Sequence, residues 1–147
     1  MHTLKYIFIS IISLILLLTA CGNDEKTEIT VQDNPEVVAV AFFNALYNEK
    51  NIKKAASVCT PKLSRLILHY RYPQAVGRHL FNMSYDKVEA KPDDSGVKIR
   101  EQFKGRAVIT LYFDGYHQDE RLKDVKKLSL IQLDDEWFID EILKDPF

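Results

Sequence analysis

The hydrophobic period of the chain changes midway, and this change constrains the fold more than any other feature. Up to about Phe81, apolar residues recur at spacings of three and four, as in helices that turn one side to a core. From Met83 onward they alternate with polar residues at a spacing of two, as in strands buried on one face. A run of helices followed by a run of antiparallel strands predicts an α+β fold.

Cap residues and prolines divide the first half into helices. Asparagines at positions 34 and 51 are placed to cap helix starts, and prolines at positions 35, 61 and 73 suit a first helical turn. A residue before a proline is pushed out of the helical region, so Tyr72 is expected to end a helix. The sequence therefore predicts helices over about residues 34–48, 53–58, 61–70 and 73–81. The first of these is expected to face the core with Val38, Ala41, Phe42, Ala45 and Leu46.

Alternating segments divide the second half into strands. The clearest segment runs from Ala107 to Phe113, where apolar residues occupy every second position. Turn residues follow at positions 92–96, 104–105 and 134–136. We expect strands over residues 83–90, 97–103, 106–113, 125–133 and 137–143, with residues 114–124 forming a longer polar connection.

The N-terminus has the pattern of an export signal. Lys5 precedes an apolar run over residues 6–18, which is shorter than the ~20 residues of a spanning helix. The run ends in Leu18-Thr19-Ala20-Cys21, which resembles the lipobox of bacterial lipoproteins. The resemblance implies that residues 1–20 are a signal peptide and that Cys21 carries acyl chains such as palmitate. Residues 21–33 would then be a flexible lipidated tether, and residues 34–147 one globular domain. The alternatives are an ordinary secretory signal or an uncleaved anchor.

The residue after the lipidated cysteine bears on the compartment. In a cell with two membranes, the lipoprotein family uses an aspartate at this position to retain the protein in the inner membrane. This chain has Gly22 there. The resemblance therefore implies a lipid-anchored protein of the outer membrane, with its domain facing the periplasm.

The net charge and the cysteine count bear on which classes of function the protein can have. The formal net charge of −1 at pH 7 gives no support for nucleic-acid binding. Cys59 is the only cysteine after Cys21, so the exported domain has no intrachain disulfide. Its apolar surroundings favour a small buried side chain, the alternative being a reactive or intermolecular thiol.

Three segments carry a further resemblance. They are the helix residues 42–47 (Phe-Phe-Asn-Ala-Leu-Tyr), residues 51–56 (Asn-Ile-Lys-Lys-Ala-Ala) and the hairpin over residues 130–140 with Trp137 after an acidic turn. Their order is similar to that of the NTF2-like (cystatin-like, SnoaL/ketosteroid-isomerase-type) superfamily. Glu136 stands where relatives usually have glycine. The resemblance implies a curved antiparallel sheet wrapped around the first helix as a cone, with a ligand site at the open end, Trp137 in a structural role and a sheet face that can pair two copies.

A polar cluster at the end of the clearest strand is the candidate for catalysis. It consists of Tyr112, Asp114, Tyr116 and His117. The resemblance implies that Asp114 or His117 could act as a general base and a tyrosine as an oxyanion donor, which requires an enclosed pocket. The alternative, which we favour, is a solvated loop. The histidines of the domain lack the spacing of metal ligands, and no metal or cofactor is expected.

The stretch between Lys50 and Tyr85 contains no acidic residue. Its cations are explained by a solvated helix face or, alternatively, by a patch for anionic headgroups or an acidic partner. The patch would comprise Lys53, Lys54, Lys62, Arg65, Arg71 and Arg78.

Together these patterns favour a non-catalytic envelope lipoprotein that binds a small amphipathic ligand or a protein partner. Two alternatives stay open. One is a cofactor-free enzyme of the isomerase or dehydratase type that uses the cone, and the other is a structural subunit that forms a homodimer through the outer sheet face. The homodimer would need exposed apolar residues on the faces that carry Val108, Thr110, Tyr112, Leu128 and Leu130.

Overall fold

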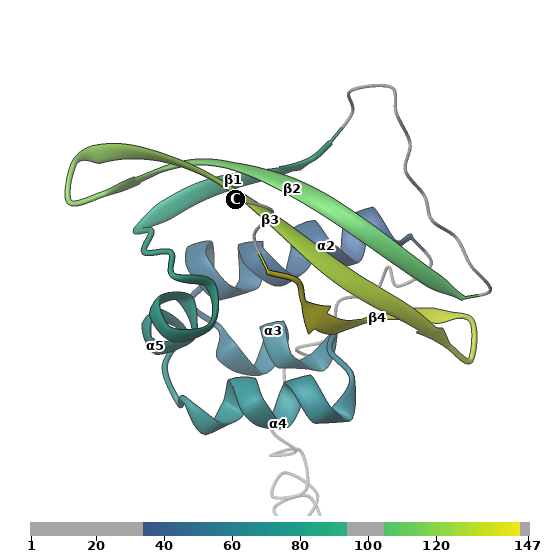
Figure 1. Ribbon diagram of the computed structural model, residues 1–147. Coiled ribbons are helices and arrows are strands. Elements are labelled where there is room, and N and C mark those ends of the chain that lie inside the picture. The colour runs from purple at the N-terminus through teal and green to yellow at the C-terminus, as the bar shows by residue number, and fades with distance from the viewer. Residues whose placement is uncertain (1–33, 94–104, 145–147) are drawn as a thin grey trace, which may run out of the picture.

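The computed structural model describes residues 34–93 and 105–144 (Figure 1). The expected signal peptide, Cys21 and the expected tether lie outside these residues, as does the strand expected over residues 97–103. Helices come first and a four-stranded antiparallel sheet follows, which confirms the α+β class.

Residues 34–93 contain the four helices that the sequence predicts. The first and the last continue into π-helical turns, labelled η1 and η2. The elements are α2 (Pro35–Phe43) with η1 (Asn44–Asn48), α3 (Ile52–Ser57), α4 (Pro61–His69), and α5 (Pro73–Val76) with η2 (Gly77–Phe81).

The predicted start signals lie where the helices begin. Proline occupies the first turn of α2, α4 and α5, where a missing N–H costs no hydrogen bond. Two asparagines supply caps: Asn34 Oδ1 accepts a hydrogen bond from Glu36 N at 2.9 Å, and Asn51 Oδ1 accepts one from Lys54 N at 3.0 Å. These local contacts explain why the helix starts could be predicted without knowledge of the tertiary fold.

The turn η1 changes which side of the first helix is buried. Its backbone closes with a hydrogen bond from Glu49 N to Asn44 O at 3.0 Å, a five-residue spacing in place of four. The extra residue rotates the chain, so that Ala45, Leu46 and Tyr47 are buried in succession. As a result, the first helix buries residues on more than one side, whereas a simple amphipathic helix buries a single stripe.

The sheet is a simple meander of four strands in the order β1-β2-β3-β4. Each strand pairs antiparallel with its sequence neighbour, and a bulge at Ser129 and Leu130 shifts the register between β3 and β4. The strands are β1 (Lys87–Pro92), β2 (Arg106–His117), β3 (Glu120–Leu133) and β4 (Glu136–Ile142).

Two sequence predictions about the strands are wrong. Residues 114–124 are not a polar connection, because β2 and β3 continue as a hairpin that turns at Gln118 and Asp119, with φ of 49° and 66°. The expected strand over residues 83–90 begins only at Lys87, opposite Tyr116, since β2 ends one residue later and offers no earlier partner.

The sheet curves over α2, and α3 and α4 lie on the far side of that helix (Figure 1). One sheet face is therefore covered by helices, whereas no described element covers the outer face. The edge of β4 is also joined to the helices: Thr60 N donates to Ile139 O at 2.8 Å, and Ile139 N donates to Val58 O at 2.9 Å. These bonds tie the start of α4 to the end of the sheet.

Aromatic rings hold the first helix against the sheet. The ring of Phe43 lies edge-on to Phe113 of β2, with centroids 4.6 Å apart, and edge-on to Phe81 of η2 at 5.0 Å. All three side chains are almost fully buried. Trp137 and Cys59 are buried too, which confirms their expected structural positions. The core thus joins α2, η2 and the sheet into one unit.

Candidate ligand cavity

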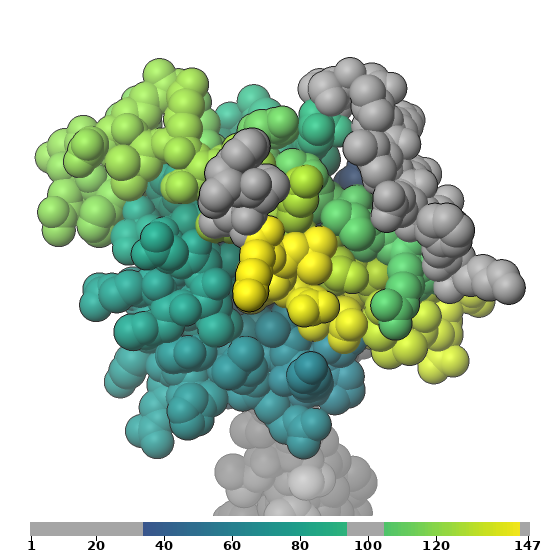
Figure 2. All heavy atoms as spheres, in the orientation of Figure 1, coloured from purple at the N-terminus to yellow at the C-terminus, as the bar shows by residue number. Residues whose placement is uncertain are grey.

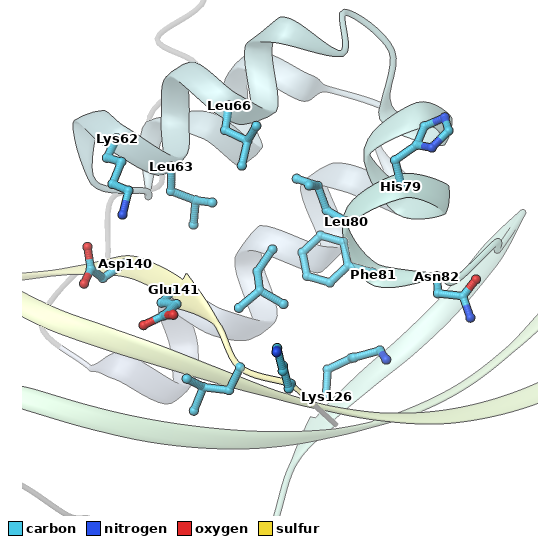
Figure 3. Close-up of a pocket in the computed structure, with 13 residues that line it drawn as sticks. Lys62, Leu63, Leu66, His79, Leu80, Phe81, Asn82, Lys126, Asp140 and Glu141 are labelled. Atoms are coloured by element: carbon cyan, nitrogen blue, oxygen red, sulfur yellow. The ribbon is translucent and has the colours of Figure 1, made fainter. Parts of the chain in front are cut away.

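A cavity of about 740 Å³ opens between α4, η2, the middle of β3 and the end of β4 (Figure 3). Small-molecule sites commonly have volumes of roughly 300–1,000 Å³, so this one suits a small ligand. Figure 2 shows β4 at the surface, between the helices and the rest of the sheet. The lining residues are Lys62, Leu63, Leu66, His79, Leu80, Phe81, Asn82, Lys126, Asp140, Glu141, Ile142, Leu143 and Lys144.

The facing walls of the cavity are apolar. Leu63 and Leu66 point into it from α4, while Leu80 and Phe81 point into it from η2 (Figure 3). Ile142 of β4 completes this lining. Since the ring of Phe81 is also packed in the aromatic core, one wall is held rigidly by the fold. An alkyl or ring system would gain by leaving water here.

Charged groups of both signs border the apolar walls. Lys126 lies on the inner face of β3 and is only 8% exposed, so its alkyl chain is enclosed by protein. Asp140 and Glu141 lie on the other side of the cavity, near Lys62 (Figure 3). A ligand that carries polar or charged groups on an apolar body matches this arrangement better than a wholly apolar one.

Local structure fixes the η2 side of the cavity. The ring of His79 stacks on Tyr70, with centroids 5.6 Å apart and an interplanar angle of 11°. Asn82 ends η2 in the left-handed conformation, with φ of 52°, a conformation that asparagine tolerates well. Stacking and chain reversal together present His79 and Asn82 at the cavity border (Figure 3).

A separate polar group lies on the inner sheet face outside the cavity. Tyr85 donates its hydroxyl to Asp124 Oδ2 at 2.5 Å, and Tyr47 donates to Met83 O at 3.3 Å. Burial, followed by the hydrogen bond to Asp124, raises the pKa of Tyr85, and burial raises the pKa of Tyr47. Both phenols therefore stay protonated and act as hydrogen-bond donors inside the fold.

A second pocket, of about 60 Å³, lies at the other end of η2. Lys50, Arg78 and His117 border it together with Asp86. Gln118 N donates to Asp86 Oδ2 at 2.8 Å, and this backbone hydrogen bond is the main cause of the lowered pKa of Asp86. This pocket of about 60 Å³ is too small for a ligand of the kind that fits the larger cavity.

The structure does not bring the four catalytic candidates into one enclosed site. Tyr112, Asp114 and Tyr116 lie on the outer face of β2, where the two tyrosines are about half exposed, at 48% and 52%. Asp114 accepts two hydrogen bonds from Arg121 across the hairpin, at 2.6 and 2.8 Å, which lowers its pKa. His117 faces the other way, 3.5 Å from Asp86 at the small pocket.

The six candidate cations are spread over three elements. Lys54 forms an ion pair with Glu49 at 2.8 Å, whereas Lys53 is exposed on α3. Arg78 borders the small pocket. The remaining three lie on α4 and the turn after it, and they are Lys62, Arg65 and Arg71.

The outer sheet face bears on the homodimer alternative. Val108, Thr110 and Tyr112 do lie on this face, but Leu128 and Leu130 point inward and are fully buried. The sequence had placed those two leucines among the exposed candidates, and the register of β2 with β3 corrects this assignment.

Apart from Lys62, sequence reasoning did not identify the charged residues that border the large cavity. His79, Lys126, Asp140 and Glu141 come from segments up to about 60 residues apart, and no local motif joins them. The one available signal is Lys126, a lysine at an inward position of an alternating strand. Such a residue breaks the apolar pattern and points to a polar feature inside.

Comparisons of the chain with protein-family models, with curated proteins and with solved structures find no match. Within residues 34–93 and 105–144, no group of three His, Cys, Asp or Glu side chains is arranged to hold a metal ion. No helix of that part of the chain has the length and apolar character needed to cross a membrane.

Proposed function

We propose that this protein is a membrane-anchored lipoprotein whose domain binds a small amphipathic ligand in the cavity between α4, η2 and β4. The cavity itself carries this proposal. Its volume of about 740 Å³, its leucine and phenylalanine walls and its charged border together suit an apolar body with a polar group. A protein partner that inserts one apolar side chain is the second kind of occupant that fits.

The cellular location of the protein is part of the same proposal. The apolar run that ends in Leu18-Thr19-Ala20-Cys21 supports lipidation at Cys21, and Gly22 supports the outer membrane with the domain in the periplasm. Several acyl chains together make a stable anchor, because each buried CH₂ adds about 0.8 kcal/mol.

An NTF2-like cone is the fold that we propose for the domain. A long first helix lies against the inner face of a curved antiparallel sheet (Figure 1). The cavity is lined by the end of β4, the edge strand of that sheet. The β3–β4 hairpin with its acidic turn and Trp137 supports this assignment.

The enzyme alternative is less well supported. An isomerase or dehydratase of this kind needs at least two titratable groups in a closed apolar pocket. Tyr112, Asp114 and Tyr116 lie on the outer face and are open to solvent instead. Of the titratable groups that border the large cavity, His79 and Glu141 are exposed, which favours a binding module.

Two leucines of α4 provide a matched test. Leu66 and Leu68 are each 43% exposed, but only Leu66 lines the cavity. In solution, a chain of residues 22–147 should bind a fluorescent amphiphile such as anilinonaphthalene sulfonate. We expect Leu66→Asp to weaken this binding about 10- to 100-fold, because a carboxylate replaces an apolar contact, while Leu68→Asp leaves it unchanged. If the two substitutions weakened dye binding equally, the assignment of the cavity as the ligand site would be contradicted.

A further inference from the structure

The exposed side of α4 combines apolar and basic side chains. Leu66 and Leu68 are 43% exposed, and Tyr72, in the turn after the helix, is 68% exposed. Arg65, His69 and Arg71 are exposed beside them. We call this surface the α4 face; it consists of Arg65, Leu66, Leu68, His69, Arg71 and Tyr72.

The helical arrangement explains why these residues share one side. Leu63 and Ile67 are buried against the fold, so the positions on the opposite side of the helix turn outward. Arg65 and His69 are four residues apart and lie at the centre of that side, with Leu66 and Leu68 flanking them. Figure 1 shows α4 on the side of the molecule away from the sheet.

The charge of this surface has one sign. The chain carries no Asp or Glu between Lys50 and Tyr85. Within residues 34–93 and 105–144, Asp140 and Glu141 of β4 are acidic residues that line the cavity together with α4, and they lie near Lys62 (Figure 3). Arg65 donates its Nε to Pro61 O, at 3.1 Å, and its side chain is exposed. The positive charge of the α4 face is therefore carried by Arg65 and Arg71.

We propose that the α4 face binds the anionic headgroups of a phospholipid bilayer and so turns the cavity mouth towards the membrane. Arginine pairs with phosphate through two parallel hydrogen bonds, and tyrosine and leucine suit the boundary between headgroups and acyl chains. Leu66 belongs to both the α4 face and the cavity lining, so a bilayer bound to this face lies next to the cavity. An amphipathic ligand could then pass between the bilayer and the cavity without crossing water.

Two arginines and three apolar side chains bind a bilayer only weakly on their own. Each arginine near an anionic surface contributes roughly a five-fold gain in binding. The inference rests on the proposed lipid anchor, because the anchor is what keeps the domain close to the membrane. Even when fully extended, the roughly 14 residues between Cys21 and Pro35 span no more than about 50 Å, so the anchor holds the domain at a high effective concentration beside the bilayer.

The test reproduces the anchor chemically. A chain of residues 21–147 is coupled through the Cys21 thiol to a maleimide lipid in vesicles that contain phosphatidylglycerol and a brominated phospholipid. Cys59 is buried and burial raises the pKa of its thiol, so coupling is selective for Cys21. The reporters are Tyr72→Trp on the α4 face, at a position that is 68% exposed, and, as a control, Tyr116→Trp on the outer sheet face, at a position that is 52% exposed. The native Trp137 is buried and is common to both variants, so the comparison depends on the added indole.

We expect the brominated lipid to quench the indole of Tyr72→Trp and to leave that of Tyr116→Trp unquenched. Adding Arg65→Gln and Arg71→Gln should abolish the quenching, as should vesicles of phosphatidylcholine alone or 0.5 M salt. The control pair Arg106→Gln and Lys123→Gln removes the same charge from the outer sheet face and should have no effect. For the uncoupled chain of residues 22–147, the Arg65 and Arg71 pair should weaken vesicle binding about 30-fold.

Equal quenching of both reporters, or none in either, would overturn the inference. Loss of the quenching on adding the control pair, Arg106→Gln and Lys123→Gln, would overturn it as well, because net charge alone would then explain binding. Neither Arg65 nor Arg71 lines the cavity, so their replacement should leave dye binding in solution unchanged. Loss of the ligand site and loss of the membrane surface are therefore separate results.

Discussion

Replacing Phe43 by alanine tests the core that holds the cavity wall. Phe43 is fully buried, and its ring contacts Phe42, Phe81 and Phe113 edge-on, at centroid distances of 4.9, 5.0 and 4.6 Å. Truncating a buried phenylalanine costs about 3–5 kcal/mol, and each lost edge-on contact adds to the upper end of this range. We expect Phe43→Ala to lower the free energy of unfolding by about 4.5 kcal/mol.

The assay is urea unfolding of residues 22–147, followed by circular dichroism. With a slope of about 1.5 kcal/mol per molar, the expected loss lowers the midpoint by about 3 M and leaves the slope unchanged. Since a domain of this kind has roughly 5–15 kcal/mol of stability in total, the variant should be close to unfolding. Phe43→Leu should lose about 1–2 kcal/mol, because it keeps most of the apolar volume.

The control for this prediction is Tyr112→Ala on the outer sheet face. Its side chain is 48% exposed, so its loss should change the stability by no more than about 0.5 kcal/mol. A loss below about 2 kcal/mol for Phe43→Ala, or one equal to that of the control, would refute the position of Phe43 between α2, η2 and β2.

Three further predictions address β2, the inner sheet face and the anchor. Gly115→Ala should lower the free energy of unfolding by about 1–3 kcal/mol, because a Cβ atom there would lie 2.7 Å from the ring of Tyr85 and would overlap the carbonyl oxygen of Lys87. An unchanged urea midpoint would contradict this close approach of the two strands. Stability should fall as the pH rises above about 10, because the unfolded chain releases the Tyr85 proton there while the folded chain, through burial and the hydrogen bond to Asp124, retains it. Tyr85→Phe should remove part of that loss, and parallel pH profiles of the two proteins would exclude Tyr85 as its source. Cys21→Ser should abolish labelling of the protein with radioactive fatty acid in cells, and labelling at the level of the wild type would rule out the lipobox assignment.

The helical half could be predicted from the sequence because its signals are local. A proline or an asparagine at a helix start acts within three or four residues, so Asn34 and Asn51 identify their helices without any tertiary contact. The β3–β4 turn was predictable for the same reason, since Asp134 and Asp135 adopt the positive φ values that a two-residue hairpin requires.

The β2–β3 hairpin shows why other parts were not predictable. Its turn residues, Gln118 and Asp119, adopt positive φ values, but they lie within a longer polar stretch, residues 114–124, in which no pair stands out as the turn. Beyond Phe113 the strands carry charged residues on the outer face, such as the pair of Asp114 with Arg121, and these obscure the alternation. Cross-strand pairing stabilises this segment, and the pairing is visible only once the register is known.

The cavity could not be predicted because it depends on how distant elements meet. Its residues lie on α4, η2, β3 and β4, and the two bonds between Ile139 and the segment 58–60 set the position of α4 relative to β4. Within any one of these elements, the leucines are indistinguishable from ordinary core residues.

The most direct test of the central claim is native mass spectrometry of residues 22–147 produced in a bacterial periplasm. We expect the wild-type chain to carry a small molecule of a few hundred daltons that is lost on denaturation, and we expect Leu66→Asp to be free of it while Leu68→Asp retains it. A wild-type chain that stays at its bare mass, also after incubation with single-chain amphiphiles, would contradict the assignment of the cavity as a ligand site.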